Sequence, residues 1–404
     1  MKKICVVGLG YIGYPLAVSL AQHFSVSGYD SSKRKINEIK KFKKIKNFKF
    51  SNNINCLANS DVFIVTVPTP IYSNNKPDLS HIINATNLIS QYVNKKSLII
   101  YESTVYPGVT EEVCVPILEK VSKLKLNRDF YVGYSPERVN VGQKSRDITK
   151  INKIISGSNN LAIRKVKNIY SKIIKADLYT APSIKVAEAA KVIENIQRDI
   201  NIALVNELSI IFDKLKIDSY SVFKAASTKW NYVDYRPGLV GGHCVGVDPY
   251  YLAHKSKLHN INPKIILQGR KVNESMSNYA SKKLQKQINL KFGNKSINLL
   301  VLGCSFKSDC DDVRNSKVFD LFNHLQKKYK SIYMYDPIAK LKDDQKQKYN
   351  FLKTIKGKYD VIVLAVSHKI FLSKKFNLFK YLKKDYLLFD IMNSLKKDKL
   401  IIKL

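Results

Sequence analysis

Short apolar runs alternate with segments of helical periodicity along the first part of the chain. Four such runs, at 4–7, 61–70, 97–104 and 130–138, are typical of strands that are buried on both faces. The segments between them have the character of helices. This alternation of strand and helix predicts an α/β fold with a doubly wound parallel sheet.

The pattern changes after Pro182 and returns near the end of the chain. Residues 183–215 contain neither Gly nor Pro and predict one long helix, with more helical sequence up to about residue 290. From Ser296 onward, apolar runs at 297–305 and 360–368 repeat the earlier pattern. We therefore predict two Rossmann-like doubly wound α/β domains joined by a long central helix and a helical domain, with bounds 1–182, 183–292 and 293–404.

Three glycines follow the first apolar run with the spacing G-x-G-x-x-G. Gly8, Gly10 and Gly13 allow a tight turn, the close approach of a pyrophosphate and close packing of the next helix. A second strand ends at Asp30, 22 residues after Gly8, where a carboxylate accepts hydrogen bonds from ribose hydroxyls and repels a 2′-phosphate. Because strand, loop, helix, second strand and acid come in this order, the segment predicts a site for NAD rather than NADP.

The same N-terminal segment mimics a secretory signal peptide, with Lys2 and Lys3 ahead of an apolar stretch, but the dinucleotide site explains more of its pattern.

Six cysteines lie far apart without a C-x-x-C pair, which argues against a disulfide scaffold and against a zinc site. Free thiols are typical of a reducing compartment, so we expect a cytoplasmic protein without a metal. No apolar run reaches the roughly 18–20 residues of a spanning helix, so we expect no membrane partner.

The chain of 404 residues carries 69 Lys and Arg against 32 Asp and Glu, a net charge of +37. Such a charge gives non-specific affinity for phosphate and is one footprint of nucleic-acid binding. Few of these residues are Arg, however, the Lys are scattered, and no nucleic-acid-binding motif accompanies them. We therefore expect no nucleic-acid partner and interpret the excess of Lys as codon bias and solvated surface.

The most unusual local sequence is the glycine-rich stretch 236–251, which contains Cys244 and Asp248. Its glycines let the backbone approach a ligand closely. A thiol becomes a nucleophile where a neighbouring base or positive charge lowers its pKa. The alternative is a cysteine that serves as a small hydrophobic residue.

The predicted long helix carries a polar group of residues on one face. Offsets of four and seven residues place Lys191, Asn195 and Arg198 on the same side of the helix. This face is either a solvated polar surface or a set of donors that holds an anionic substrate.

Nine segments in order resemble the nucleotide-sugar 6-dehydrogenases, the UDP-glucose/GDP-mannose dehydrogenase family, over essentially the whole chain. They are GLGYIGYPLA, TVPTP, ESTVYPG, SPERVN, AEAAKVIENIQRDINIALVNEL, TKWNY, PGLVGGHCVGVDPYYL, GRKVNESM and FKSDCDDVRNSK. The chain is most similar to the bacterial UDP-N-acetylhexosamine dehydrogenases, because Val141 stands where UDP-glucose dehydrogenases have an acid. Val141, Cys304 and Ser305 depart from the Pro, Leu and Thr that are more usual in the resembled proteins.

The resemblance implies a homodimeric enzyme that oxidises the C6 alcohol of UDP-GlcNAc or UDP-GalNAc to a uronic acid with two NAD⁺, for capsule or O-antigen synthesis. It implies a thiohemiacetal and a thioester on Cys244. Lys191 would stabilise oxyanions with Asn195 as a neutral donor, Asp248 would orient water, and Glu137 would act as the base in thioester hydrolysis. UDP-ManNAc and UDP-glucose are the alternative substrates.

The resemblance also assigns contacts residue by residue. The cofactor contacts comprise the three glycines of the first loop and Tyr11, Ile12, Asp30, Lys35, Thr69, Thr104 and Arg314. The UDP-sugar contacts comprise Arg138, Val139, Lys191, Asn195, Arg198, Gly241, Arg270, Phe306 and Lys307. Two other classes stay open: NAD dehydrogenases of 3-hydroxy acids or 6-phosphogluconate, which need neither the cysteine nor a second α/β domain, and a basic nucleic-acid binder.

Overall fold

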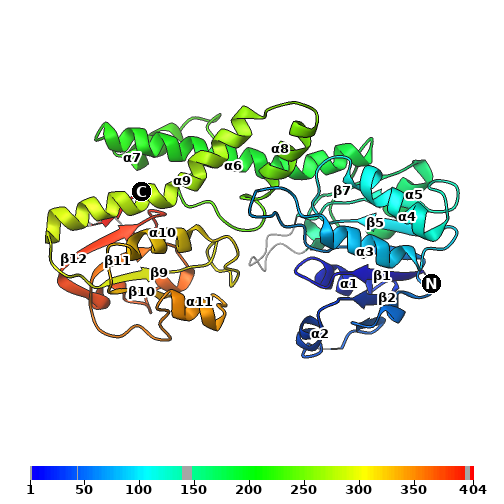
Figure 1. Ribbon diagram of the computed structural model, residues 1–404, viewed down its shortest axis with the longest axis horizontal. Helices are drawn as coiled ribbons and strands as arrows, with labels where there is room; N and C mark the ends of the chain where they lie inside the picture. Colours follow the sequence, from blue (N-terminus) through cyan, green and yellow to red (C-terminus); the bar gives the residue numbers. More distant parts are fainter. Residues whose placement is uncertain (1, 43, 139–147, 396–400) are drawn as a thin grey trace. The chain divides into compact units, whose positions relative to one another are not determined.

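The computed structural model describes residues 2–42, 44–138, 148–395 and 401–404. The chain divides into two compact units, each built on one sheet (Figure 1). The first unit comprises Met1–Glu194 and Tyr250–Asn262, and the second comprises Asn195–Pro249 and Pro263–Leu404. Within the described ranges, the helices are too short or too polar to cross a membrane.

The sheet of the first unit has eight strands in the order β3-β2-β1-β4-β5-β6-β7-β8. Neighbouring strands are parallel, except that β7 runs antiparallel to β6. The winding reverses between β1 and β4, which is where doubly wound sheets bind their ligands. The bounds are β1 Lys3–Val7, β2 Ser25–Tyr29, β3 Phe48–Ser51, β4 Val62–Val65, β5 Leu98–Tyr101, β6 Tyr131–Tyr134, β7 Lys153–Gly157 and β8 Leu178–Thr180.

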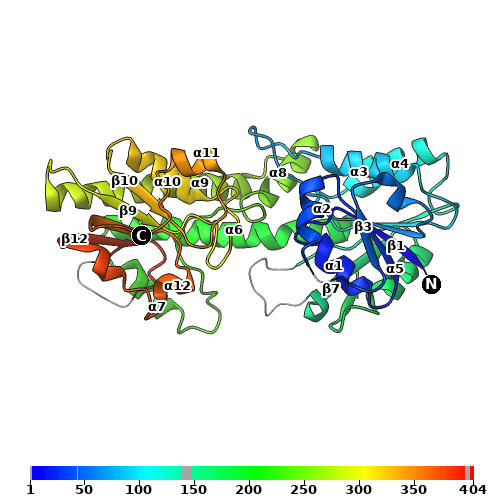
Figure 2. The same cartoon turned by 90° about the horizontal axis from the view of Figure 1, so that it is seen from below.

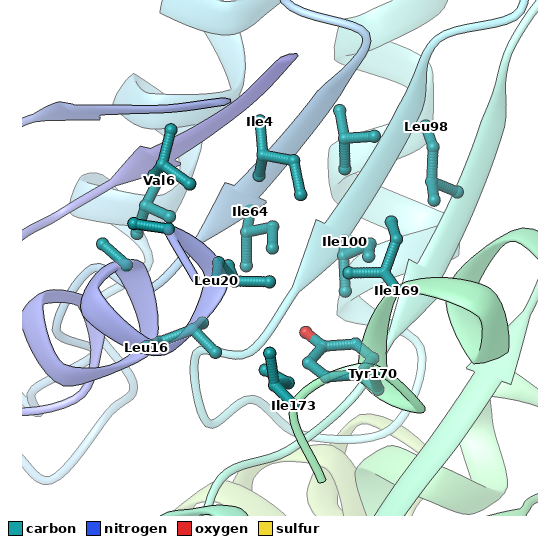
Figure 3. Packing of buried hydrophobic residues seen from close by; sticks show 14 of the residues in the cluster. Ile4, Val6, Leu16, Leu20, Ile64, Leu98, Ile100, Ile169, Tyr170 and Ile173 are labelled. Atoms are coloured by element: carbon teal, nitrogen blue, oxygen red, sulfur yellow. The ribbon is translucent and has the colours of Figure 1, made fainter. Parts of the chain in front are cut away.

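Helices cover both faces of this sheet, which explains why its central strands are continuously apolar. Residues of α1 and α5 pack with one face of β1, β4 and β5 in a single core cluster (Figure 3), while α3 and α4 lie on the opposite side (Figure 2). The antiparallel pairing of β6 with β7 departs from the predicted parallel sheet. It is short and joins Gly133 to Gly157 and Tyr134 to Ser156. The helices are α1 Gly13–Leu20, α2 Lys33–Ile39, α3 Ser80–Ser90, α4 Val115–Ser122 and α5 Asn160–Tyr170.

The second unit has a five-stranded, wholly parallel sheet in the order β10-β9-β11-β12-β13. Residues of α9 and α10 pack on one face of this sheet, and Phe371 of α12 packs against residues on the other face. The predicted second α/β domain is therefore confirmed. The elements are α7 Ser219–Ala226, α9 Lys264–Phe292, β9 Leu299–Leu302, α10 Lys317–Gln326, β10 Ile332–Tyr335, α11 Asp343–Lys348, β11 Tyr359–Leu364, α12 Lys369–Leu372, β12 Leu382–Asp390 and β13 Ile401–Lys403.

The long helix predicted over 183–215 is α6, which spans Ile184–Lys214 over 31 residues. It has no Gly or Pro to interrupt it, and it supplies residues to both units. The glycine-rich stretch ends where α8 begins, at Asp248–Leu258. The loops after β1, β4, β5 and β6, together with α6 and the glycine-rich stretch, hold most of the residues that the sequence predicts to be functional.

Candidate active site

The glycine loop after β1 is packed too tightly for side chains at two of its positions. Gly8 has a φ of +95°, and a Cβ on Gly13 would lie 1.8 Å from the Gly8 carbonyl oxygen. Thr66 closes the loop by donating its hydroxyl to Gly8 O at 2.6 Å. Helix α1 starts at Gly13, and Ile12 before it supplies no side-chain cap. Its first N–H groups suit a phosphate, as the spacing of the glycines predicts.

Asp30 lies beside this loop at the end of β2. Its Oδ2 accepts a hydrogen bond from Leu9 N at 2.9 Å, and its Oδ1 accepts one from Ser32 N at 2.9 Å. Lys35 Nζ lies 6.0 Å from the centroid of the exposed Tyr11 ring. The structure thus gathers the predicted contacts for the adenosine half of NAD around one loop, and a buried turn with an acid at its rim fits that group.

The loops after β4 and β5 are tied to each other at the same edge of the sheet. Thr69 donates its hydroxyl to Thr104 O at 2.6 Å. Tyr251 of α8 donates to Thr69 O at 2.6 Å. Glu188 of α6 accepts from Gly108 N at 2.6 Å, which holds the second loop from the helix side. Thr69 and Thr104 are therefore positioned together. Tyr251 and Glu188 hold their loops in place, and neither of these two residues was predicted from the sequence.

Glu137 and Arg138 follow β6, and both are held by charged partners. Glu137 is buried and accepts from Arg138 N at 2.6 Å and from Lys153 Nζ at 3.0 Å. The Arg138 guanidinium donates to Lys191 O at 2.8 Å and pairs with Glu194. The predicted contact Val139 lies outside the described residues. Arg138 is thus held against the turn of α6 that carries Lys191 and Glu194.

The predicted polar face of α6 is mostly buried. Lys191 and Asn195 are 6% and 3% exposed, whereas Arg198 is exposed. Asn195 Nδ2 donates to Asp248 Oδ2 at 2.5 Å, and Asp248 N donates to Cys244 O at 2.8 Å. Asn195, Asp248 and the backbone of Cys244 therefore form one hydrogen-bonded unit.

The loop that carries Cys244 is docked against the segment after β9. A Cβ on Gly241 would lie 2.4 Å from Asn315 O, and one on Gly242, which has a φ of +86°, would lie 2.6 Å from the Phe306 ring. Gly242 N also donates to Asn315 O at 3.2 Å. The glycines are needed here because two backbones meet, and they leave the Cys244 thiol half-buried.

Two cationic side chains, Lys307 and Arg314, lie near this loop. Burial lowers the pKa of Lys307, while the nearby charge of Cys244 opposes this shift. Arg314 is held by Asp312, whose Oδ1 accepts from Nε at 3.0 Å and whose Oδ2 accepts from Nη2 at 2.6 Å. Positive charge near a thiol favours the thiolate, which is the nucleophilic form.

Arg270 lies under the same loop. Its side chain is 2% exposed and pairs with Asp199 at 2.7 Å and with Glu274. A Cβ on Gly246 would lie 3.8 Å from its Nη2. The resemblance assigns Arg270 to the substrate, and its position below the Cys244 loop also lets it support that loop. Elsewhere in the described chain, no three His, Cys, Asp or Glu side chains gather in a way that suits a metal.

The fold and these sites define an NAD-dependent dehydrogenase with a second nucleotide-binding-type domain. Models of the UDP-glucose/GDP-mannose dehydrogenase family match in three parts: the NAD binding domain over 2–174, the central domain over 185–275 and the UDP binding domain over 300–397. The chain belongs to this family. It is therefore an NAD-dependent nucleotide-sugar dehydrogenase, an oxidoreductase.

Known relatives align over nearly the whole chain. A UDP-N-acetyl-D-glucosamine 6-dehydrogenase of Pseudomonas aeruginosa is 43% identical, with 98% of each chain covered. Protein CapL of Staphylococcus aureus is 41% identical over 99% of this chain and 97% of its own. The solved structure of a UDP-D-ManNAc dehydrogenase from Pyrococcus horikoshii is 29% identical, with a TM-score of 0.88 over 100% of this chain and 99% of the other.

Proposed function

We propose that this enzyme oxidises the C6 alcohol of a UDP-N-acetylhexosamine, UDP-GlcNAc first among them, to the uronic acid. Support comes from relatives named UDP-N-acetyl-D-glucosamine 6-dehydrogenase, which are 44% and 43% identical, whereas those named for UDP-N-acetyl-D-mannosamine are 32% or less identical. The product would feed the synthesis of a surface polysaccharide such as a capsule or O-antigen.

The observation that carries the mechanism is the hydrogen-bonded unit of Cys244, Asp248 and Asn195. When bound, NAD⁺ supplies the acceptor for the hydride that leaves the C6 carbon. As this hydride leaves, the hydroxyl proton passes to water and the C6 alcohol becomes an aldehyde. The Cys244 thiolate adds to the aldehyde carbon, and protonation of the resulting alkoxide gives a thiohemiacetal. Transfer of a second hydride from that carbon to a second NAD⁺, with loss of the hydroxyl proton to water, would give a thioester.

Water then hydrolyses the thioester. Glu137 accepts a proton from the water as its oxygen bonds to the carbonyl carbon, and the carbon–sulfur bond breaks to release the Cys244 thiolate and the uronate. Lys191 stabilises the oxyanions that form at each stage, and Asn195 is a neutral donor beside it. A thiol suits the reaction because its acyl adduct forms readily and is readily hydrolysed.

The variant Cys244→Ser tests this assignment, because serine keeps the shape of the loop and removes the thiol. We expect it to bind NAD⁺ with the affinity of the unchanged enzyme and to form no uronate from UDP-GlcNAc. A second assay compares NADH production from UDP-GlcNAc, UDP-GalNAc, UDP-ManNAc and UDP-glucose. Uronate formation by Cys244→Ser at the full rate would rule out the covalent mechanism.

A further inference from the structure

Buried charged groups meet behind Glu137, at the ends of β5, β6 and β7. Lys153, the first residue of β7, lies with its Nζ 3.0 Å from Glu137 Oε2 and 3.3 Å from Glu102 Oε1. None of these three side chains is more than 3% exposed. Glu102 directly follows β5, and the proposed mechanism uses neither it nor Lys153. Two carboxylates thus share one buried ammonium.

The two carboxyl groups have unequal partners. Glu137 has a donor on each oxygen, Arg138 N at 2.6 Å and Lys153 Nζ. Glu102 Oε1 accepts from Tyr170 and Lys153, but its Oε2 is buried and meets no hydrogen-bond donor among the described residues. An oxygen without a donor makes the ionised form more costly. The proton that neutralises the cluster therefore belongs on Glu102.

We propose that Glu102 is a positioning residue that sets the basicity of Glu137 through Lys153, by gaining or losing a proton inside the buried cluster. The inference rests on the proposed function, because it concerns the hydrolysis of the thioester. When Glu102 is protonated, Lys153 and Glu137 form a neutral pair and Glu137 is a weak base. When Glu102 is ionised, it competes with Glu137 for the Lys153 ammonium, and the weaker hold of Lys153 makes Glu137 a stronger base.

The surroundings of Glu102 place this change within the working range of an enzyme. Its titratable neighbours in the described structure are Lys153 on β7, Glu137 after β6 and Tyr170 on α5. Burial raises the pKa of Glu102 to about 7, with Lys153 lowering it and Glu137 raising it. The Tyr170 ring lies in the packed core near Ile169 and Ile173, so its hydroxyl has little freedom to leave Glu102 (Figure 3).

Rapid mixing with NAD⁺ and UDP-GlcNAc between pH 5.5 and 9 tests the proposal. Both hydrides leave before hydrolysis, so a slow hydrolysis step gives a burst of NADH followed by a slower steady rate. We expect the steady rate of the unchanged enzyme to rise with pH through about 7. In Glu102→Gln we expect the burst to remain, this rise to vanish, and the steady rate at pH 8.5 to fall roughly tenfold, because the neutral amide adds no negative charge beside Lys153.

A second variant shifts the rise instead of removing it. Tyr170→Phe removes the hydroxyl that donates to Glu102, which makes the ionised carboxylate less stable and moves the rise to higher pH. The matched control is Ser156→Ala on β7, because Ser156 is buried and donates to Tyr134 O at 2.8 Å outside the cluster. We expect Ser156→Ala to keep the pH profile of the unchanged enzyme.

The results of these experiments distinguish failure of the proposed role of Glu102 from failure of the proposed function. A wild-type pH profile in Glu102→Gln, or an unshifted rise in Tyr170→Phe, would overturn the role of Glu102. If Glu102→Gln does not fold, Tyr170→Phe alone decides, because it loses a single hydroxyl. Failure of the proposed function is distinct from both results, since the unchanged enzyme would then produce no NADH with any UDP-sugar.

Discussion

Single residues set the geometry around Cys244, and the glycines before it are the most demanding. Gly242 combines a φ of +86° with an aromatic ring 2.6 Å from the position of a Cβ. Any side chain there would have to move either the Cys244 loop or Phe306. The position of the thiol therefore depends on a residue that has no chemistry of its own.

The variant Gly242→Ala is expected to displace this loop. A left-handed backbone costs an L-residue about 1–2 kcal/mol, and a displaced nucleophile lowers kcat/KM by roughly tenfold or more. Steady-state NADH assays and urea unfolding measure the two effects. Gly246→Ala is the matched control, since its Cβ would meet nothing closer than Gly242 O at 3.6 Å. Equal activity in the two variants would contradict the account.

Some residue positions can be predicted from the sequence, whereas contacts between distant residues cannot. Local spacing predicts the positions of Gly8, Gly13 and Asp30, because the turn and the ribose acid belong to one strand–helix–strand unit. The contact between Glu102 and Tyr170 joins residues 68 positions apart through the pairing of β5, β6 and β7. Its only local signal is Lys153, a buried lysine that opens strand β7.

At the scale of elements, β2 and β10 end in the same way. Asp30 and Asp336 each accept a backbone N–H from the loop after the neighbouring first strand, from Leu9 and Cys304. In the second unit the acid is also bonded to His368, with Nε2 at 3.0 Å from Oδ2. The repeated pattern of the sequence thus corresponds to a repeated loop structure, in which Asp336 is committed to internal contacts.

Asp336 gives a prediction about stability. Although burial opposes ionisation, hydrogen bonds from His368 and the backbone hold the pKa of Asp336 at about 2, below its ordinary 3.8. Its stabilisation is therefore present above pH 4 and is lost as pH falls toward 2. Asp336→Asn should lower the free energy of unfolding by about 2 kcal/mol at pH 7, and by less below pH 4.

Urea unfolding at several pH values measures this difference. Asp343→Asn is the control, because that carboxylate on α11 is 98% exposed and pairs only with Lys346 among the described contacts. An Asp336→Asn variant as stable as the unchanged protein at pH 7 would show that the bonds to His368 and the loop contribute nothing.

At the scale of the whole molecule, α6 presents an apolar stripe. Val186, Ile193, Leu204 and Ile211 are 43%, 52%, 54% and 44% exposed. They are separated by 7, 11 and 7 residues, so they share one face of the helix. Several large exposed apolar residues on one helix face are typical of an interface. This face supports the expected homodimer.

The double variant Ile193→Asp, Leu204→Asp is expected to be monomeric at micromolar concentration, because each substitution places a charge within the interface. Size-exclusion chromatography with light scattering measures the mass. Leu290→Asp on α9 is the control, since Leu290 is 73% exposed and lies on another helix. A double variant with the mass of the unchanged protein would place the interface elsewhere.

The sequence predicts the general chemistry of the substrate but not the configuration of its sugar. The chain's net charge of +37 suits anionic ligands in general, but we expect binding to depend on a few positioned groups such as Lys307 and Arg314. The fold of both units follows from apolar runs and helical spacing. The configuration of the sugar does not, because it depends on side chains that come together only in three dimensions.

The ratio of NADH formed to sugar consumed tests the central claim most directly. With limiting UDP-GlcNAc and excess NAD⁺, the mechanism through Cys244 removes two hydrides before product leaves. We expect two NADH for each UDP-sugar, with the uronate as the product by mass spectrometry. One NADH for each sugar, with a released aldehyde, would contradict it.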